Sequence, residues 1–185
     1  VALTTDQVTG LNTRTVQALS TEAITALTTG QIEVINTAGL AALTTSQVKA
    51  LSTDAVIALS TYQVANLTTG TMAALSTAQV AAIETTDIQA LSTRQLATLA
   101  TGTVSALTTD QVVALTTYQI GNLSTTTLKA LSSDQIAAIE TTDIQALTTG
   151  QLAGLVSSTV SALTTDQVIA LTTYQVSNLS TATLK

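Results

Sequence analysis

Aliphatic side chains return every eight residues along the whole chain. From Leu3 to Leu179, every eighth residue is Leu or Ile, with no gap or insertion. Five residues after each of these stands a second aliphatic residue, which is Val, Ile or Leu and once Met72. Polar residues fill most positions between them. Because 23 copies stand in register, the pattern predicts a repeat architecture in which every unit folds in the same way.

The repeat unit, called an octad below, has the consensus Leu-Thr-Thr-x-Gln-Val-x-Ala, with the leucine as position one. Position two is usually Thr or Ser, and position three is Thr except at Ser133 and Ser157. Position five is often Gln, and position eight is usually Ala. Positions four and seven vary freely. The constant positions therefore indicate which side chains determine the local structure.

A single continuous helix does not explain this period. Eight residues rotate an α-helix by about 800°, so an apolar stripe would slip by about 80° in every octad. A short helix that restarts in each octad fits better. Thr or Ser at position two with Gln three residues later, as in Thr108 and Gln111, is the capping-box pattern. Position six and the next position one are three apart and share a helix face.

The almost invariant Thr at position three competes with position two as the residue that caps each helix. We expect it to stop one short helix and to cap the next, since Thr is a favoured N-cap residue. The predicted structural caps are Thr5, Thr45, Thr109, Thr117, Thr165 and Thr173.

The predicted fold is therefore all-α, a solenoid or superhelix of very short helices with one helix per octad. The alternative is a β-solenoid, because Thr, Val and Ile favour strands. Positions one and six have opposite parity, however, so each octad would need a corner. Only 8 Gly and no Pro are present to form such corners.

We expect residues 1–185 to form one continuous array, cut from a longer protein, with neighbouring repeats as each other's partners. A second period of 56 residues is superimposed, since residues 75–91 resemble residues 131–147. Tyr62, Tyr118 and Tyr174 follow the same spacing. Recent duplication of seven octads explains it. Alternatively, seven octads make a whole number of superhelical turns and align the tyrosines on one side.

Composition excludes several classes of function. His and Cys are absent, so Ser-His and Cys-His nucleophile pairs, disulfides and thiolate metal sites cannot form. The net charge is −6 and no basic cluster occurs, which argues against nucleic-acid binding. No apolar run is long enough to span a bilayer. We expect no enzyme activity, no metal and no cofactor.

Two acidic pairs are the remaining candidates for chemistry. Glu84 stands near Asp87, and Glu140 near Asp143, in two copies of the sequence IETTDIQAL. Such pairs could bind Ca²⁺ weakly or act as an acid and a base. The simpler interpretation is that acids occupy both ends of the capping motif at positions two and five.

Two repeated side-chain types are candidates for a binding surface. Tyr62, Tyr118 and Tyr174 each precede an Asn by four residues, which favours a local hydrogen bond over a ligand site. The threonine stripe has a regularity similar to the ice-binding faces of some antifreeze solenoids. The simpler explanation of the stripe is that every octad must turn, and Thr serves that turn.

The octads resemble Thr-rich repeat tracts of very large secreted bacterial surface proteins of the adhesin and haemolysin-related kind. The resemblance covers the whole chain and lies in the style of the repeat. It implies an extracellular or cell-surface spacer or stalk. The alternative function is a binding surface for ice, glycan or a protein partner, including self-association, built from the Thr or Tyr array.

Overall fold

The computed structural model describes residues 3–99, 101–155 and 160–179, and these residues form short α-helices with no strand among them. The all-α solenoid predicted from the octads is confirmed, and the β-solenoid alternative is wrong. The chain divides into two compact units, residues 1–98 and 99–185. The expectation of a single continuous array stays a prediction.

Each described helix is four to six residues long and begins at position three of an octad. In the first unit the helices are α1 (Thr5–Thr9), α2 (Thr13–Gln17), α3 (Thr21–Thr25), α4 (Thr29–Val34), α5 (Thr37–Ala42), α6 (Thr45–Ala50), α7 (Thr53–Ile57), α8 (Thr61–Ala65), α9 (Thr69–Ala74), α10 (Thr77–Ala81), α11 (Thr85–Ala90) and α12 (Thr93–Thr98). In the second they are α13 (Thr101–Val104), α14 (Thr109–Val113), α15 (Thr117–Gly121), α16 (Thr125–Ala130), α17 (Ser133–Ala138), α18 (Thr141–Ala146), α19 (Thr149–Gly154), α21 (Thr165–Ala170) and α22 (Thr173–Ser177).

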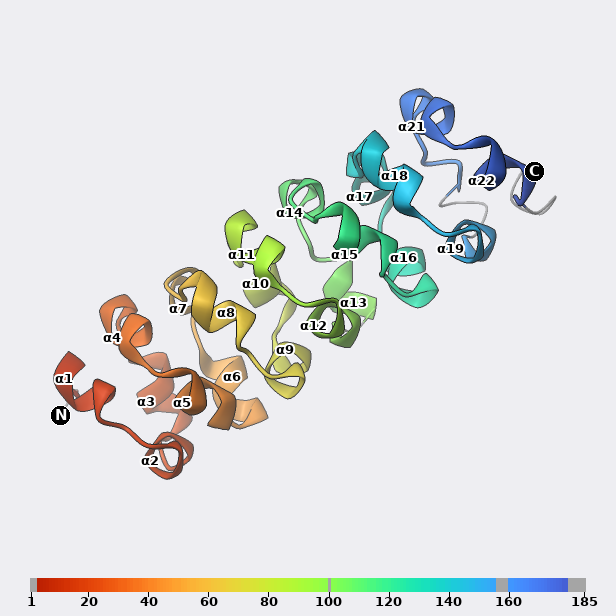
Figure 1. Cartoon of the computed structure of the whole chain (residues 1–185). Helices are drawn as coiled ribbons and strands as arrows, with labels where there is room; N and C mark the ends of the chain where they lie inside the picture. Colours follow the sequence, from red (N-terminus) through yellow and green to blue (C-terminus); the bar gives the residue numbers. More distant parts are fainter. Residues whose placement is uncertain (1–2, 100, 156–159, 180–185) are drawn as a thin grey trace. The chain divides into compact units, whose positions relative to one another are not determined.

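Extended residues at positions one and two separate successive helices. After α6, Leu51 has φ −61° and ψ 133°, and Ser52 then has φ −70° and ψ 162°. The extended ψ carries the chain away from the helix axis, so the next helix starts in a new direction, as Figure 1 shows. Each octad thus contributes one turn or so of helix and one corner.

Positions one and six form the core, as the pattern predicts. Position-six side chains such as Ile88 and Leu128 are 0% exposed, and position-one side chains such as Leu91 and Leu115 are 3–4% exposed. In most octads both aliphatic positions therefore face the interior, while positions four and seven face outward. Val168 and Val176, at position six of two late octads, are exceptions at 51% and 49% exposure. This division explains why only positions four and seven vary freely.

Helices pack against the helix three places further along the chain. In the first unit α3, α6, α9 and α12 form one stack, and α1, α4, α7 and α10 form another (Figure 1). In the second unit α15, α18 and α21 stack, as do α13, α16, α19 and α22. One superhelical turn therefore takes three octads, and each octad packs on the turn before and the turn after.

Three octads per turn decide between the two explanations of the 56-residue period. Seven octads are not a whole number of turns. Accordingly, Tyr118 on α15 and Tyr174 on α22 belong to different stacks of the second unit. The interpretation that the period aligns the tyrosines on one side is wrong, and duplication of a seven-octad block remains as the explanation.

Small residues allow close packing between turns at particular places. Gly39 is buried at position five of its octad, where an added Cβ would lie 3.1 Å from Ile35 Cγ2 and 3.4 Å from Val16 Cγ2. By contrast, a Cβ added to Gly30 at position four would have no atom within 4 Å. Gly39 therefore allows two turns to pack closely, whereas Gly30 has space for a larger side chain.

We expect Gly39→Val to lower the free energy of unfolding by about 1–3 kcal/mol, because the branched side chain overpacks the site between Ile35 and Val16. Gly30→Ala is the matched control, and we expect it to raise stability by about 0.5–1 kcal/mol through lower chain entropy in the unfolded state. Urea titration followed by circular dichroism measures both. Equal effects of the two substitutions would contradict the packing assigned to Gly39.

Candidate functional site

The most distinctive polar side chains in the structure are the buried glutamines at position five. Eleven of them are only 1–6% exposed: Gln31, Gln47, Gln63, Gln79, Gln95, Gln111, Gln119, Gln135, Gln151, Gln167 and Gln175. A buried primary amide must find partners for one acceptor and two donor groups. The hydrogen-bond partners of these amides show which parts of the fold each octad holds together.

The amide oxygen closes the capping box of its own octad. Gln63 Oε1 accepts a hydrogen bond from the Ser60 N–H at 2.7 Å, while the Ser60 hydroxyl accepts one from the Gln63 N–H at 3.3 Å. Thr108 and Gln111 form the same reciprocal pair, at 2.9 and 3.1 Å. The capping box predicted from the sequence is thus confirmed. Each box satisfies two backbone N–H groups that the helix itself leaves unpaired.

The amide nitrogen reaches the turn before. Gln63 Nε2 donates to the Ile32 carbonyl at 2.9 Å and to the Ile35 carbonyl at 2.8 Å. These acceptors lie 31 and 28 residues earlier, at position six and the following position one. The same two offsets recur at Gln47, Gln79, Gln95, Gln135, Gln151, Gln167 and Gln175.

These buried glutamines therefore use both the oxygen and the nitrogen of the amide inside the fold. One amide holds the start of its own helix and the carbonyl-rich end of a helix one turn away. Because the amide is neutral, it does this without burying a charge. The arrangement joins successive turns, and it offers no group to a substrate.

The structure corrects the assignment of the caps. The N-caps are the position-two residues, for example Thr4, Thr44 and Thr108, whose ψ angles of 160–162° direct the side-chain oxygen toward the N–H three residues on. Position three is already the first helical residue. The predicted cap residues Thr5, Thr45, Thr109, Thr117, Thr165 and Thr173 are therefore not N-caps but open the helix.

Octads without glutamine replace its bonds in part. At Gly39 the position-five side chain is missing, and the N-cap Asn36 instead donates from Nδ2 to the Leu11 carbonyl at 3.4 Å. Leu11 is a position-one residue 28 residues before Gly39. A glutamine in place of Gly39 would therefore have the Leu11 carbonyl as one of its two acceptors, by the offset that joins Gln63 to Ile35. At Thr71 the hydroxyl pairs with that of Thr68 at 2.9 Å and stays within its own octad. The inter-turn bond can thus be provided by a different position.

The two acidic octads depart from the capping box. Glu84 and Glu140 are N-cap residues, yet neither side chain makes a capping hydrogen bond. Asp87 and Asp143 take the place of glutamine and are each 2% exposed. The acids thus occupy positions two and five, and Glu84 and Glu140 are exposed N-cap residues, as the simpler interpretation expects. The capping hydrogen bond expected of them is wrong, because the carboxylate at position two does not accept from the N–H at position five.

The three tyrosines lie on the surface. Tyr62, Tyr118 and Tyr174 are 71–72% exposed, and the Asn four residues after each donates from Nδ2 to the carbonyl of its own Tyr at 2.8 Å. The local hydrogen bond expected from the spacing is confirmed. Five residues before each Tyr stands another exposed aliphatic side chain, Ile57, Val113 or Ile169. The fold does not bring Tyr118 and Tyr174 together.

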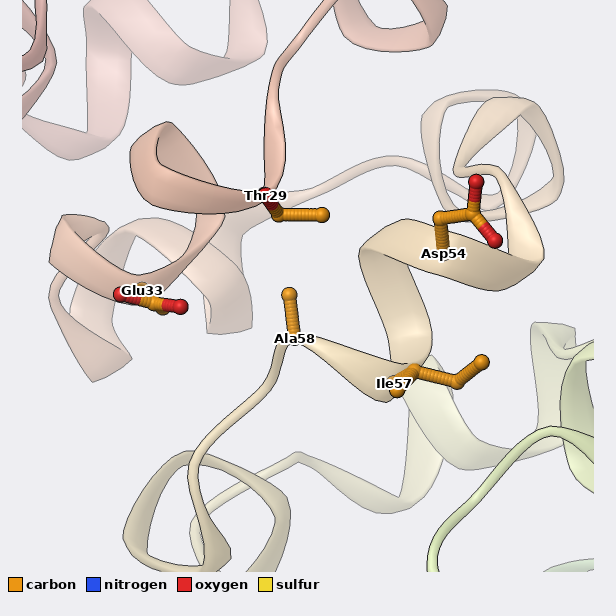
Figure 2. Close-up of a pocket in the computed structure, with 5 residues that line it drawn as sticks. All are labelled: Thr29, Glu33, Asp54, Ile57 and Ala58. Atoms are coloured by element: carbon orange, nitrogen blue, oxygen red, sulfur yellow. The ribbon is translucent and has the colours of Figure 1, made fainter.

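An open groove of about 420 Å³ lies between α4 and α7, lined by Thr29, Glu33, Asp54, Ile57 and Ala58. Figure 2 shows Glu33 and Asp54 on opposite sides of Thr29 and Ala58, so the two carboxylates do not converge. Within the described residues no three His, Cys, Asp or Glu side chains gather as a metal site. No described helix is long and apolar enough to cross a membrane.

A carboxylate in the first turn of α3 has a lowered pKa. The pKa of Glu22 is lowered by a hydrogen bond from its own backbone N–H and by the Ser20 hydroxyl at the start of α3. This carboxylate is fully exposed. Its shift reflects the usual preference for an acid in the first turn of a helix and does not indicate a catalytic group.

Comparison with known families agrees with the repeat. The family described as ALTTAQ repeat matches residues 1–34, 32–69, 80–117, 117–149, 136–173 and 146–181. The chain belongs to the ALTTAQ repeat family. The six letters of the family name correspond to position eight of one octad followed by positions one to five of the next. Residues 74–79, for example, read Ala-Leu-Ser-Thr-Ala-Gln. A search of curated proteins found no significant match.

The ALTTAQ octad thus includes the glutamine that is frequent at position five, and the structure explains its role. Sequence reasoning identified only the capping half of its role. The missed half is the bond to the turn before. Its signal was the frequent choice of Gln at a position where Glu would complete a capping box equally well.

Proposed function

We propose that this ALTTAQ repeat array is a non-enzymatic structural module that spaces or extends other domains of a large extracellular protein. The observation that carries the proposal is the internal use of the buried polar side chains. The position-five amides bond to their own helix and to the preceding turn, as Gln63 and Gln167 do. Nearest-neighbour packing of this kind lets octads be added without redesign of the rest.

The bacterial adhesin or haemolysin-related setting is part of this proposal. It is supported by the style of the repeat and by a composition without Cys and with 9% charged residues. A stalk needs repeated units and a surface that does not aggregate. The variable positions four and seven carry the Lys, Arg and many of the acidic side chains that such a surface uses.

Small-angle X-ray scattering of this chain and of its tandem duplicate tests the spacer. A spacer lengthens in proportion to its octads, so its radius of gyration is expected to rise about twofold on duplication. A compact particle would increase only about 1.3-fold. The smaller increase would contradict a spacer.

The exposed tyrosines favour a second candidate function, a surface that binds glycan, ice or a protein partner. Tyr62 lies 71% exposed beside the exposed Ile57 of the preceding octad. Ice recrystallisation and glycan binding are to be measured for the chain and for a variant with Tyr62, Tyr118 and Tyr174 changed to Ala. A clear signal that this variant loses would support the binding surface over the spacer.

A further inference from the structure

The acidic octads place a carboxylate where neighbouring octads place an amide. Gln79 donates to the Val48 and Leu51 carbonyls at 2.6 and 2.8 Å. Two octads later, Gln95 donates to the Val64 and Leu67 carbonyls. Asp87 holds the same place in the octad between them. The offsets of 31 and 28 residues that the glutamines use lead from Asp87 to the carbonyls of Val56 and Leu59, and α11 packs against α8 just after them.

Asp87 is 2% exposed, and its Oδ2 is buried with no hydrogen-bond partner within the described part of the chain. In the same part of the chain no donor reaches the Leu59 carbonyl, which the amide of a glutamine would have satisfied. Asp87 Oδ2 and the Leu59 carbonyl thus both lack a donor in the described part of the chain, whereas the Val56 carbonyl accepts from the Leu59 N–H at 3.2 Å. A buried carboxylate in such a place is costly unless a cation or a donor is supplied.

The size of the gap indicates what fits. Asp is one methylene shorter than Gln, so its oxygens lie about 1.5 Å further from the carbonyls. In the flanking octads the glutamine nitrogens lie 2.6–3.1 Å from the equivalent carbonyls. We therefore expect the oxygens of the shorter Asp87 side chain to lie about 4 Å from the Val56 and Leu59 carbonyls. A Ca²⁺ ion bound to oxygens at about 2.3–2.6 Å bridges a separation of that order.

We propose that Asp87 binds a Ca²⁺ ion between its carboxylate and the Leu59 and Val56 carbonyls. The buried oxygen without a partner is observed at Asp87. The same offsets and the same 2% exposure extend the proposal to Asp143 with the Leu115 and Val112 carbonyls. The ion replaces the inter-turn link that glutamine provides elsewhere. Carbonyl and carboxylate oxygens are ligands that Ca²⁺ accepts in flexible geometry, with water completing the shell. Glu84 and Glu140 make no capping bond and add negative charge beside each site.

Equilibrium dialysis of the full chain against ⁴⁵Ca²⁺ and thermal unfolding with and without Ca²⁺ test the proposal. We expect one ion per acidic octad, with a Kd of about 10⁻⁴–10⁻³ M. At tenfold Kd, with both sites filled, the Tm is expected to rise by about 7 °C. The double variant Asp87→Gln, Asp143→Gln is expected to fold, to bind no ion and to show no Ca²⁺-dependent shift in Tm.

The control is the double variant Asp134→Asn, Asp166→Asn, which removes the same charge from two exposed position-four residues. It is expected to keep both ions and the full shift in Tm. The proposal is overturned if the native chain shows no saturable binding up to about 10 mM Ca²⁺, the range beyond extracellular calcium modules. It is also overturned if the Gln variant keeps its ions or if the Asn control loses them.

Discussion

A peptide of residues 27–50, which contains three octads, is expected to give the circular dichroism spectrum of an unfolded chain, whereas residues 27–98, with nine octads, are expected to be helical and to unfold cooperatively in urea. The reason is that the most extensive packing of each helix is with helices three places away. Three octads form one turn and contain no such pair. Helices of four to six residues are far too short to persist alone in water.

The intermediate length sharpens this test. Residues 27–74 form two turns, in which each helix is covered on one side, so partial and weakly cooperative helicity is expected. All three peptides should be compared at two concentrations, because short peptides that stack on each other would imitate the longer chain. Concentration-independent helicity in the three-octad peptide would contradict packing between turns as the source of stability.

The short helices and their buried face could be predicted because they depend on residue spacings within one octad. Thr108 and Gln111 stand three residues apart, and that spacing alone specifies a capping box and a helix start. Val112 and Leu115 are likewise three apart, which places both on the buried face. Both inferences need only atoms within one octad, so a single sequence is enough.

The number of octads per turn could not be predicted in the same way. The hydrophobic pattern repeats in every octad and has no component at 24 residues, so it contains no sign of which octads touch. The second role of Gln63 was hidden for a related reason. Its acceptors are the backbone carbonyls of Ile32 and Ile35, and every residue has such a carbonyl. No complementary side chain marks the partner.

The caps were misassigned because constancy was taken as evidence of capping. Position three is the more constant, yet position two has the extended backbone that a cap requires. Packing offers a reason for the constancy. A Cβ added to Gly154, at position eight, would lie 3.0 Å from the Thr125 Cγ2 at position three of the turn before. The methyl group of a position-three threonine thus packs against the position-eight residue of a later turn, which is usually Ala.

The substitution Gln63→Glu is expected to lower the free energy of unfolding by about 3 kcal/mol or more. Glutamate has the same shape and keeps the oxygen that accepts from Ser60, so the capping box can persist. The nitrogen that donates to Ile32 and Ile35 becomes an oxygen, which brings a buried carboxylate against two carbonyls. Urea unfolding of the full chain at neutral pH measures the loss.

Two controls separate the inter-turn bond from capping and from charge. Gln7 makes the same capping box with Thr4, but its amide nitrogen makes no hydrogen bond within the described residues, so Gln7→Glu should change stability by less than about 0.5 kcal/mol. Gln145 is exposed in the interior of the array, and Gln145→Glu should be similarly mild. If Gln63→Glu proved as mild as these two, the amide would act only as a cap and the turns would be held together by their aliphatic core.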